Sequence, residues 1–236
     1  MRYIDFHTHI IPKMDDGAKN AGESVEMLKT ALSSGAQTVV LTPHYLAGES
    51  ISEFCERRNE KVALLKKTMS ENSGKYPDIL CGAEVLLCSA LSEHDDLNKL
   101  CIEGTDLLLL ELPYPSWNKW HIQEVYNIIA RHNLTPVMAH IERYLNKPKE
   151  MNKLDQLISI GAKFQINADS FLTFSGKRVI KALAREGLIS AIASDCHNLT
   201  SRSPDISHAV ATLAKTFGDS FISDIFDNSM KLLMNS

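Results

Sequence analysis

Short apolar runs alternate with longer amphipathic segments along the whole chain. The run LLLLELP at 107–113 is apolar on both alternating faces, as expected of a strand buried on both sides of a parallel sheet. Between the runs, apolar residues recur at helical spacing, as in 23–35, which ends on Gly35, a common helix stop. The predicted strands are 3–6, 38–43, 78–87, 107–113, 134–140, 162–167 and 189–194, and the predicted helices are 23–35, 52–70, 119–132, 150–160, 176–186, 205–216 and 219–234.

A strand–helix alternation with buried apolar strands predicts an α/β fold built on a parallel sheet. Seven strand–helix units in a chain of 236 residues favour a single (β/α) barrel domain over residues 1–236. An open doubly wound sheet is the alternative. No linker, low-complexity segment or internal repeat interrupts the pattern.

Composition excludes some classes of function. The chain is 44% hydrophobic and 23% charged, with a net charge of -4 and no Lys/Arg-rich run, so we expect no nucleic-acid or anionic-membrane surface. The N-terminal MRYIDFHTHII does not resemble a secretory signal, and the longest apolar run is too short to span a bilayer. Five cysteines without a CxxC pair favour reduced thiols in a cytoplasmic protein.

Metal-capable side chains gather at the C-terminal ends of all the predicted strands except the sixth. In a parallel barrel these ends open on one face, where active sites lie. The residues are His7, His9, Asp15, Asp16, His44, Glu84, Glu111, His140, Glu142, Asp195 and His197. We therefore expect them to converge on one barrel mouth.

Two patterns carry most of the weight. The pair His7 and His9 places both imidazoles on one side of a strand, because strand side chains alternate. Glu111 follows four leucines, and Glu84 stands between Ala83 and Val85. A charge buried in such surroundings is strongly unfavourable unless it is paired or bound to a metal ion.

Five imidazoles with several carboxylates exceed the needs of one ion. Mixed nitrogen and oxygen ligation suits Mn, Fe or Zn, and a site with two metal ions can hold a bridging hydroxide for an in-line displacement. Arg143 and Arg202 each follow a predicted ligand by a few residues, and guanidinium groups match phosphate oxygens. The combination predicts metal-dependent hydrolysis of a phosphoester.

The stretch SDCHNLTSR at 194–202 also allows another chemistry. Cys196 and Arg202 have the spacing of a thiolate phosphatase nucleophile and its phosphate-binding arginine. However, the loop between them has no glycine to form a backbone phosphate cradle, and Asp195 would raise the thiol pKa by like-charge repulsion. We therefore interpret Asp195 and His197 as metal ligands and expect Cys196 to point away from the metals.

The motifs HTHIIPKMDDGAKN, TVVLTPHY, GAEV, LELP, AHIERY and ASDCHN occur in an order that resembles the polymerase-and-histidinol-phosphatase (PHP) superfamily. In particular, the chain is similar to its bacterial metal-dependent protein-tyrosine phosphatases, which are encoded with capsule and exopolysaccharide genes. The resemblance covers nearly the whole chain. It implies a distorted, TIM-like barrel of seven strands.

The resemblance also implies two or three divalent metal ions, most often Mn, with Fe, Mg or Zn as alternatives. It departs at Ile141, where proline is expected, and it favours Asp16 over Asp15 as a ligand. It assigns Arg143 and Arg202 to the phosphate. The implied ligand sets are His7, His9, Glu84 and Asp195 for one ion, Glu84, Glu111 and His140 for a second, and Asp16, His44 and His197 for a third.

The substrate implied by the resemblance is phosphotyrosine on a protein, namely an autophosphorylated bacterial tyrosine kinase that regulates polysaccharide synthesis. A small-molecule phosphatase, such as a histidinol-phosphate phosphatase, is an alternative that the same metals would serve. A metal-dependent amidohydrolase usually needs a bridging lysine at the end of a middle strand, where this chain has Glu111-Leu112-Pro113. An inactive metal-binding regulatory module is the non-enzymatic alternative. The oligomeric state stays open.

Overall fold

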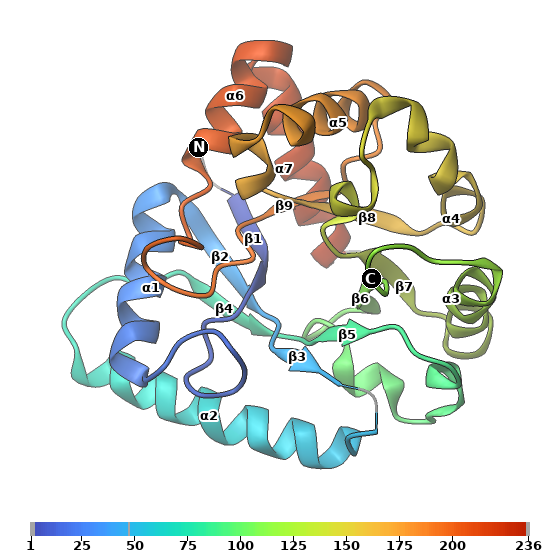
Figure 1. Cartoon of the computed structure of the whole chain (residues 1–236). Helices are drawn as coiled ribbons and strands as arrows, with labels where there is room; N and C mark the ends of the chain where they lie inside the picture. Colours follow the sequence, from blue (N-terminus) through green and yellow to red (C-terminus); the bar gives the residue numbers. More distant parts are fainter. Residues whose placement is uncertain (1–2, 47, 235–236) are drawn as a thin grey trace.

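The computed structural model describes residues 3–46 and 48–234, which form a curled parallel sheet with helices around its outer side (Figure 1). The predicted α/β class is confirmed. The strands are β1 (Tyr3–Thr8), β2 (Ala36–Leu41), β3 (His44–Tyr45), β4 (Asp78–Cys81), β5 (Glu84–Leu86), β6 (Leu107–Glu111), β7 (Thr135–Met138), β8 (Lys163–Asn167) and β9 (Ala191–Ala193). The α-helices are α1 (Ala21–Ser34), α2 (Ile51–Glu71), α3 (Lys119–His132), α4 (Asp155–Ser159), α5 (Phe174–Arg185), α6 (Ser207–Phe217) and α7 (Asp219–Met234). The 3₁₀-helices are η1 (Leu91–Glu93), η2 (Leu97–Leu100), η3 (Ile141–Tyr144), η4 (Pro148–Leu154) and η5 (Asp169–Leu172).

Hydrogen bonding divides the strands into two sheets. One has the order β1-β2-β4, and the other has the order β3-β5-β6-β7-β8-β9. Every pairing between these strands is parallel. All the strands therefore present their C-terminal ends to the same side of the molecule, which is the geometry that the site requires.

The prediction of seven strands in one closed sheet is not confirmed, because the predicted strand 78–87 is broken by a bend and an additional short strand, β3, follows the predicted strand 38–43. The segment 38–43 becomes the end of β2, after which Pro43, which lacks a backbone N–H, precedes β3. The segment 78–87 is broken at Gly82 between β4 and β5. The two bends run side by side, since the Gly82 amide donates to Leu41 O (2.9 Å) and the Glu84 amide to Pro43 O (3.1 Å).

The first and last strands of the chain meet at one place. The only bridge recorded there between described residues joins Thr8 to Cys196. Next to it, the Asp195 amide donates to His7 O and the His9 amide donates to Cys196 O, both at 2.9 Å. This contact between β1 and the segment after β9 brings the HxH pair (His7 and His9) beside Asp195 and His197.

The helices follow the predicted pattern with one exception. α1 begins where the Asn20 side chain accepts from the Glu23 amide, and it ends at Gly35 in a left-handed conformation (φ 114°). The predicted helix 150–160 is instead the 3₁₀-helix η4 followed by the short α4, with Pro148 in the first turn of η4. Among the described residues, no helix combines the length and apolar character needed to cross a membrane.

The core lies on both sides of the curled sheet. β6 shows why: Leu108 and Leu110 belong to the larger cluster under the helices, whereas Leu107 and Leu109 belong to a smaller cluster inside the curl. All four leucines are at most 1% exposed, so the predicted burial of this strand on both faces is confirmed. This apolar plug fills the curl below the polar mouth, and α7 packs over β1 and β9.

The loop between β1 and α1 is packed tightly over the end of β1, and Gly17 makes this possible. A Cβ atom built at Gly17 would lie 2.0 Å from the backbone oxygen of His9. The Ala18 amide also donates to that oxygen (3.0 Å). The contact holds the Asp15–Asp16 pair over the mouth.

Gly17→Ala is therefore expected to destabilise the fold by about 1–3 kcal/mol, because the clash is with backbone and the loop must shift. It is also expected to weaken divalent metal binding, since Asp15 and Asp16 move with the loop. Urea denaturation and metal titration check both effects. Gly22→Ala adds the same methyl group as a control, because its nearest neighbour is a side-chain atom, the Asn20 Oδ1 that caps α1, at 3.2 Å and not backbone at 2.0 Å. Unchanged stability and metal affinity in Gly17→Ala would contradict this account of the loop.

Candidate metal centre

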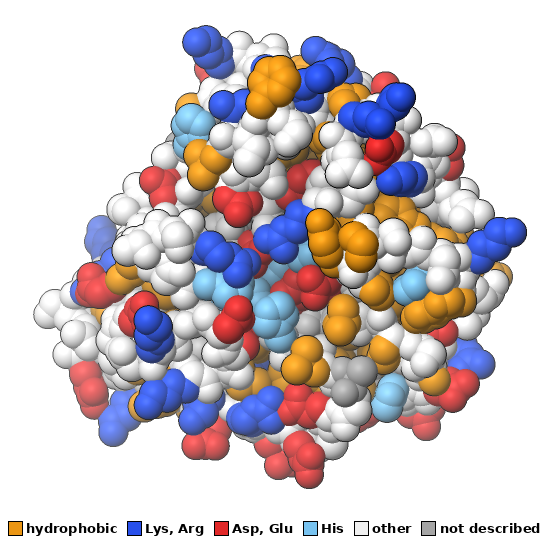
Figure 2. All heavy atoms as spheres, in the orientation of Figure 1, with side chains coloured by type: hydrophobic (Ala, Val, Ile, Leu, Met, Phe, Trp, Pro, Cys, Tyr) orange, Lys and Arg blue, Asp and Glu red, His pale blue; other side chains and the backbone are white. Residues whose placement is uncertain are grey.

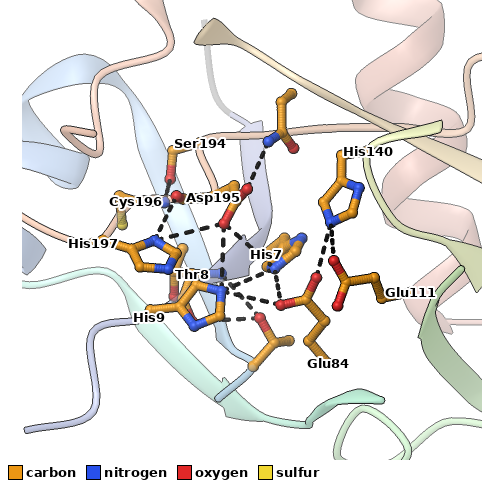
Figure 3. Close-up of polar contacts among 12 residues, drawn as sticks. His7, Thr8, His9, Glu84, Glu111, His140, Ser194, Asp195, Cys196 and His197 are labelled. Atoms are coloured by element: carbon orange, nitrogen blue, oxygen red, sulfur yellow. Dashed lines mark hydrogen bonds and ion pairs between the residues drawn. The ribbon is translucent and has the colours of Figure 1, made fainter. Parts of the chain in front are cut away.

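All the predicted residues except Glu142 meet in one cluster on the face to which the strands turn their C-terminal ends (Figure 2), and His44 and Glu84 reach it from the first residues of β3 and β5. His7 on β1 and His9 just after it have fully buried side chains, and their Nε2 atoms lie 3.0 Å apart. The expectation that the HxH pair turns both rings to one side is confirmed. Figure 3 shows the two rings facing the carboxylates of Glu84 and Asp195.

Glu84, the first residue of β5, stands at the centre of the cluster and is 2% exposed. Its contacts are with four imidazoles. Its Oε2 lies 3.1 Å from His7 Nε2, 3.3 Å from His9 Nε2 and 3.0 Å from His44 Nδ1, while Oε1 lies 3.0 Å from His140 Nε2. A buried carboxylate in these surroundings needs positive charge close by, from protonated imidazoles or from metal ions.

Asp195 faces Glu84 across the HxH pair and is 2% exposed. Its Oδ1 lies 3.3 Å from His9 Nε2 and 3.6 Å from His7 Nε2. Two arginines close over it: Arg143 Nη2 lies 2.6 Å from Oδ2 and Arg202 Nη2 lies 2.7 Å from Oδ1. The side chains of these arginines are 35% and 33% exposed, so both reach solvent at the mouth.

His44, His197 and Asp16 form the outer part of the cluster. Asp16 Oδ1 lies 3.2 Å from His197 Nε2 and 3.5 Å from His44 Nε2. The Asp16 side chain is 65% exposed, whereas the His197 side chain is 5% exposed. This part of the cluster is therefore open to an incoming substrate.

His140 and Glu111 lie on the other flank. Glu111, the last residue of β6, places Oε1 3.4 Å from His140 Nε2. His140 has a left-handed backbone (φ 34°) between β7 and η3, which turns its ring inward towards Glu84. Glu142 lies apart from the cluster, because its Oε1 accepts from the Asn167 amide and from Ser170 Oγ.

Among the described residues, three overlapping groups have donor atoms that all lie within 4.8 Å of one another. His9 and His44 each belong to two of the groups. The groups are His7, His9 and Asp195; His44, Glu84 and Glu111; and His9, Asp16, His44 and His197. The cluster thus contains donor atoms arranged closely enough to hold a metal ion.

The histidines are oriented as metal ligands are. His7 Nδ1 lies 3.2 Å from Gln165 Oε1, and His9 Nδ1 lies 2.7 Å from Asp15 Oδ2. His197 Nδ1 lies 2.9 Å from a backbone carbonyl, to which only a protonated nitrogen can donate. In these three histidines Nδ1 is held by a partner outside the centre, and Nε2 is the atom that faces it.

Unpaired atoms point to the same conclusion. Among the described residues, Glu84 Oε2 and His197 Nε2 are buried and form no hydrogen bond of good geometry, although charged partners lie 3.0–3.3 Å from Glu84 Oε2 and 3.2 Å from His197 Nε2. Burial, followed by the charges of His9 and Arg202, lowers the pKa of His197 to about 4, which keeps its imidazole neutral. Imidazole nitrogens together with buried carboxylates form a donor set that fits divalent metal ions.

The carboxylates of the cluster require positive charge nearby. Burial would raise the pKa of Glu84, but the imidazoles of His7, His140 and His44 hold its pKa well below the usual range. Burial likewise opposes ionisation of Asp195, yet His7 and His9 keep its pKa far below normal. Protons on imidazoles provide this charge when metal ions do not.

Cys196 belongs to the apolar core and not to the cluster. It is fully buried, and its sulfur points away from the imidazoles in Figure 3, as expected. Burial first, and then the charge of Asp5, raise the pKa of its thiol well above normal. A buried neutral thiol cannot act as a phosphatase nucleophile, so the thiolate mechanism is wrong for this chain.

Three supporting residues were missed or left undecided by sequence reasoning. Gln165 and Asn167 of β8 are fully buried, and they link His7 to Asp195: Gln165 Nε2 donates to Asn167 Oδ1 (2.7 Å), and Asn167 Nδ2 donates to Asp195 Oδ2 (2.7 Å). The sequence did contain evidence for Gln165 and Asn167, because KFQIN has amide side chains at two alternate positions of a buried strand, which therefore point to the same face. Asp15 supports His9 rather than joining the centre.

Comparison with known proteins defines the class. Residues 3–234 match the family described as capsular polysaccharide synthesis, CpsB/CapC, so the chain belongs to this family. It is 31% identical to tyrosine-protein phosphatase YwqE of Bacillus subtilis, covering 98% of this chain and 92% of that protein. It is 30% identical to tyrosine-protein phosphatase CpsB of Streptococcus agalactiae, covering 98% of each chain.

Solved structures agree on the fold. A structure from a study of YwqE of Bacillus subtilis and CpsB of Streptococcus pneumoniae, described as metal-dependent tyrosine phosphatases, matches 99% of this chain and 95% of that chain with a TM-score of 0.77 and 27% identity. A phosphotriesterase homology protein from Escherichia coli matches 98% of both chains with a TM-score of 0.59 and 10% identity, which is a likeness of fold alone. The predicted family is confirmed.

Gln165→Leu is expected to lower divalent metal affinity about 10- to 100-fold, because His7 loses the acceptor that orients its ring. The same amide oxygen also accepts from the His140 backbone N–H (2.9 Å), so two imidazoles are affected. Calorimetric titration of the metal-free protein with Mn²⁺ measures the change. Gln123→Leu, an exposed glutamine on α3, is the control. Equal affinities in the two variants would show that Gln165 does not orient the ligands.

Proposed function

We propose that this chain is a metal-dependent tyrosine-protein phosphatase (EC 3.1.3.48) that hydrolyses phosphotyrosine monoesters on a protein. The observation that carries the proposal is the buried Glu84 carboxylate among four imidazoles, beside two arginines at an open mouth. The relatives named tyrosine-protein phosphatase support the same activity.

The proposed ligands follow the resemblance found in the sequence. His7, His9, Glu84 and Asp195 would hold one ion, and Glu84, Glu111 and His140 would hold a second, while a third ion would take Asp16, His44 and His197. The third set agrees well with the outer group of donor atoms, to which His9 also belongs. We propose Mn as the metal, with Fe, Mg or Zn as substitutes. When bound, these ions supply positive charge to the phosphoryl group and lower the pKa of water.

Arg143 and Arg202 bind and orient the phosphate in this proposal. In the structure both contact Asp195, which keeps their guanidinium groups at the mouth. A phosphate dianion that arrives there meets two cationic forks whose free N–H groups match its oxygens. The arginines then exclude water from one side of the phosphorus and stabilise the charge that develops on the equatorial oxygens.

The phenolic substrate suits a site of this kind. The phenol of tyrosine has a pKa of about 10, so phenolate leaves more readily than an alkoxide and depends less on a strong general acid. The partner that we propose is a bacterial protein-tyrosine kinase autophosphorylated on tyrosine, in a pathway of capsule or exopolysaccharide synthesis, and acting in the cytoplasm. This agrees with the description of the family.

The activity is tested with p-nitrophenyl phosphate, a phosphotyrosine peptide and histidinol phosphate. We expect turnover of the first two, loss of turnover with a chelator, and recovery on addition of Mn²⁺, because the buried carboxylates hold the ions that the reaction needs. Phosphate release and metal content are measured on the same sample. Cys196→Ala should keep nearly the full rate per folded molecule. Activity that survives chelation, or faster turnover of histidinol phosphate than of the peptide, would contradict the proposal.

Arg202→Ala is expected to lower kcat/KM for p-nitrophenyl phosphate about 100-fold, because one preorganised donor to the phosphate is lost. Metal content should stay unchanged, since Asp195 keeps its contacts with His7 and His9. Steady-state kinetics and elemental analysis measure the two effects. Arg131→Ala, which alters an exposed arginine in the last turn of α3, is the control. Loss of metal in step with activity would mean that Arg202 supports the ligands instead.

A further inference from the structure

A second cavity lies next to the metal centre, between the loop that follows β6 and the segment from η3 to α4. Its volume is about 270 Å³. Pro115, Trp117 and Tyr144 form its apolar walls, and Lys119 and Lys153 stand at its edge. The activity proposed above has no use for this cavity, because none of the proposed ligands and neither arginine lines it.

Tyr144 connects the cavity to the centre. Its buried ring stacks on the His140 ring (centroids 6.2 Å apart, planes at 28°), and its hydroxyl donates to Leu112 O at 2.5 Å. On its other side, the edge of the Trp117 ring lies against it, with centroids 5.5 Å apart. Tyr114, 76% exposed, completes this aromatic group, with its ring centroid 6.3 Å from that of Tyr144. Two ring contacts therefore lead from a proposed ligand to the wall of the cavity.

The charged side chains that line the cavity are all positive. Its described lining contains two lysines and no carboxylate. Lys153 is partly neutralised, since its Nζ lies 2.8 Å from Glu150. Lys119 is exposed and forms no ion pair with any residue in the described part of the chain. In a protein of net charge -4, this is a local positive edge above an apolar wall.

We propose that this cavity binds the side chain of an acidic residue, Glu or Asp, close to the phosphotyrosine in the substrate protein. The methylene groups of that side chain pack against Trp117 and Tyr144, and its carboxylate meets Lys119. The ring centroids step from His140 to Tyr144 by 6.2 Å and from Tyr144 to Trp117 by 5.5 Å, and an extended peptide advances about 3.3–3.6 Å per residue, so we place the acidic residue within three positions of the phosphotyrosine. The inference rests on the proposed function, since it names a feature of the substrate of that site.

The first experiment compares phosphotyrosine peptides of glycine and serine that carry a single Glu, or a single Gln, at each position from three before to three after the phosphotyrosine. We expect kcat/KM to be higher for Glu than for Gln at one or two positions. Lys119→Glu should lower kcat/KM for the preferred Glu peptide about fivefold to tenfold, while leaving the matched Gln peptide and p-nitrophenyl phosphate unchanged. Lys75→Glu, the same charge change before β4 at the opposite end of the strands, is the control.

A second experiment measures peptide binding at the cavity by tryptophan fluorescence, without hydrolysis of the peptide. The chain has two tryptophans, so Trp120→Phe leaves Trp117 as the only one. In the Mn-loaded full chain, a peptide with a non-hydrolysable phosphonate in place of phosphotyrosine and the preferred Glu should change the Trp117 emission. Adding Lys119→Glu should raise the midpoint of that titration about fivefold to tenfold.

The results distinguish a failure of the proposed acidic subsite from a failure of the proposed function. Equal kcat/KM for every Glu and Gln pair, or equal losses for p-nitrophenyl phosphate and the peptides in Lys119→Glu, would overturn the acidic subsite. So would a Trp117 emission that responds alike to the Glu and Gln peptides. If no phosphotyrosine peptide is hydrolysed, the proposed function fails, and the emission titration still decides whether the cavity takes an acidic side chain.

Discussion

The structure depends on neutralising the buried carboxylate of Glu84. This side chain is 2% exposed, and four imidazoles surround it at 3.0–3.3 Å. An isolated charge at such a depth would be strongly unfavourable, so the neighbouring strands must deliver positive charge or metal ions to the same point. The bend at Gly82 contributes to this arrangement. After the bend β5 begins at Glu84, whose side chain is buried in the cluster instead of exposed at its edge.

Around that point the side chains act in three layers. An apolar plug of residues such as Phe6 and Leu109 fills the curl below. Above it lie the imidazoles and carboxylates, held by Gln165, Asn167 and Asp15, and above those lie the arginines and the exposed Asp16. In this arrangement the buried imidazoles and carboxylates are shielded from solvent, while the exposed arginines and Asp16 leave the mouth accessible to a phosphorylated side chain.

Much of this was predictable because strand ends are marked in the sequence. The apolar runs located most of the strands, and the histidines, aspartates and glutamates within or directly after these runs marked the mouth, where the structure brings the proposed ligands together. The predicted strand 38–43 does end at Pro43, but strand β3 beyond it was not predicted, and the apolar pattern of 78–87 did not show that β4 and β5 lie in different sheets. Gln165 and Asn167 were missed because buried amides matter only through partners distant in the sequence, and the contact of Arg143 and Arg202 with Asp195 escaped prediction for the same reason.

The contact between β1 and the segment 194–196 has a consequence for the order in which the site can form. The Ser194 amide donates to Asp5 across 189 residues of sequence, and the Asp195 amide donates to His7 beside it. A growing chain that has not yet reached β9 offers the HxH pair without Asp195 or His197, and it also lacks the strand that sits against β1. Contacts of such sequence separation form late and slowly. In the proposed ligand set, the ion that takes Asp195 can therefore be held only once β9 has reached its place beside β1.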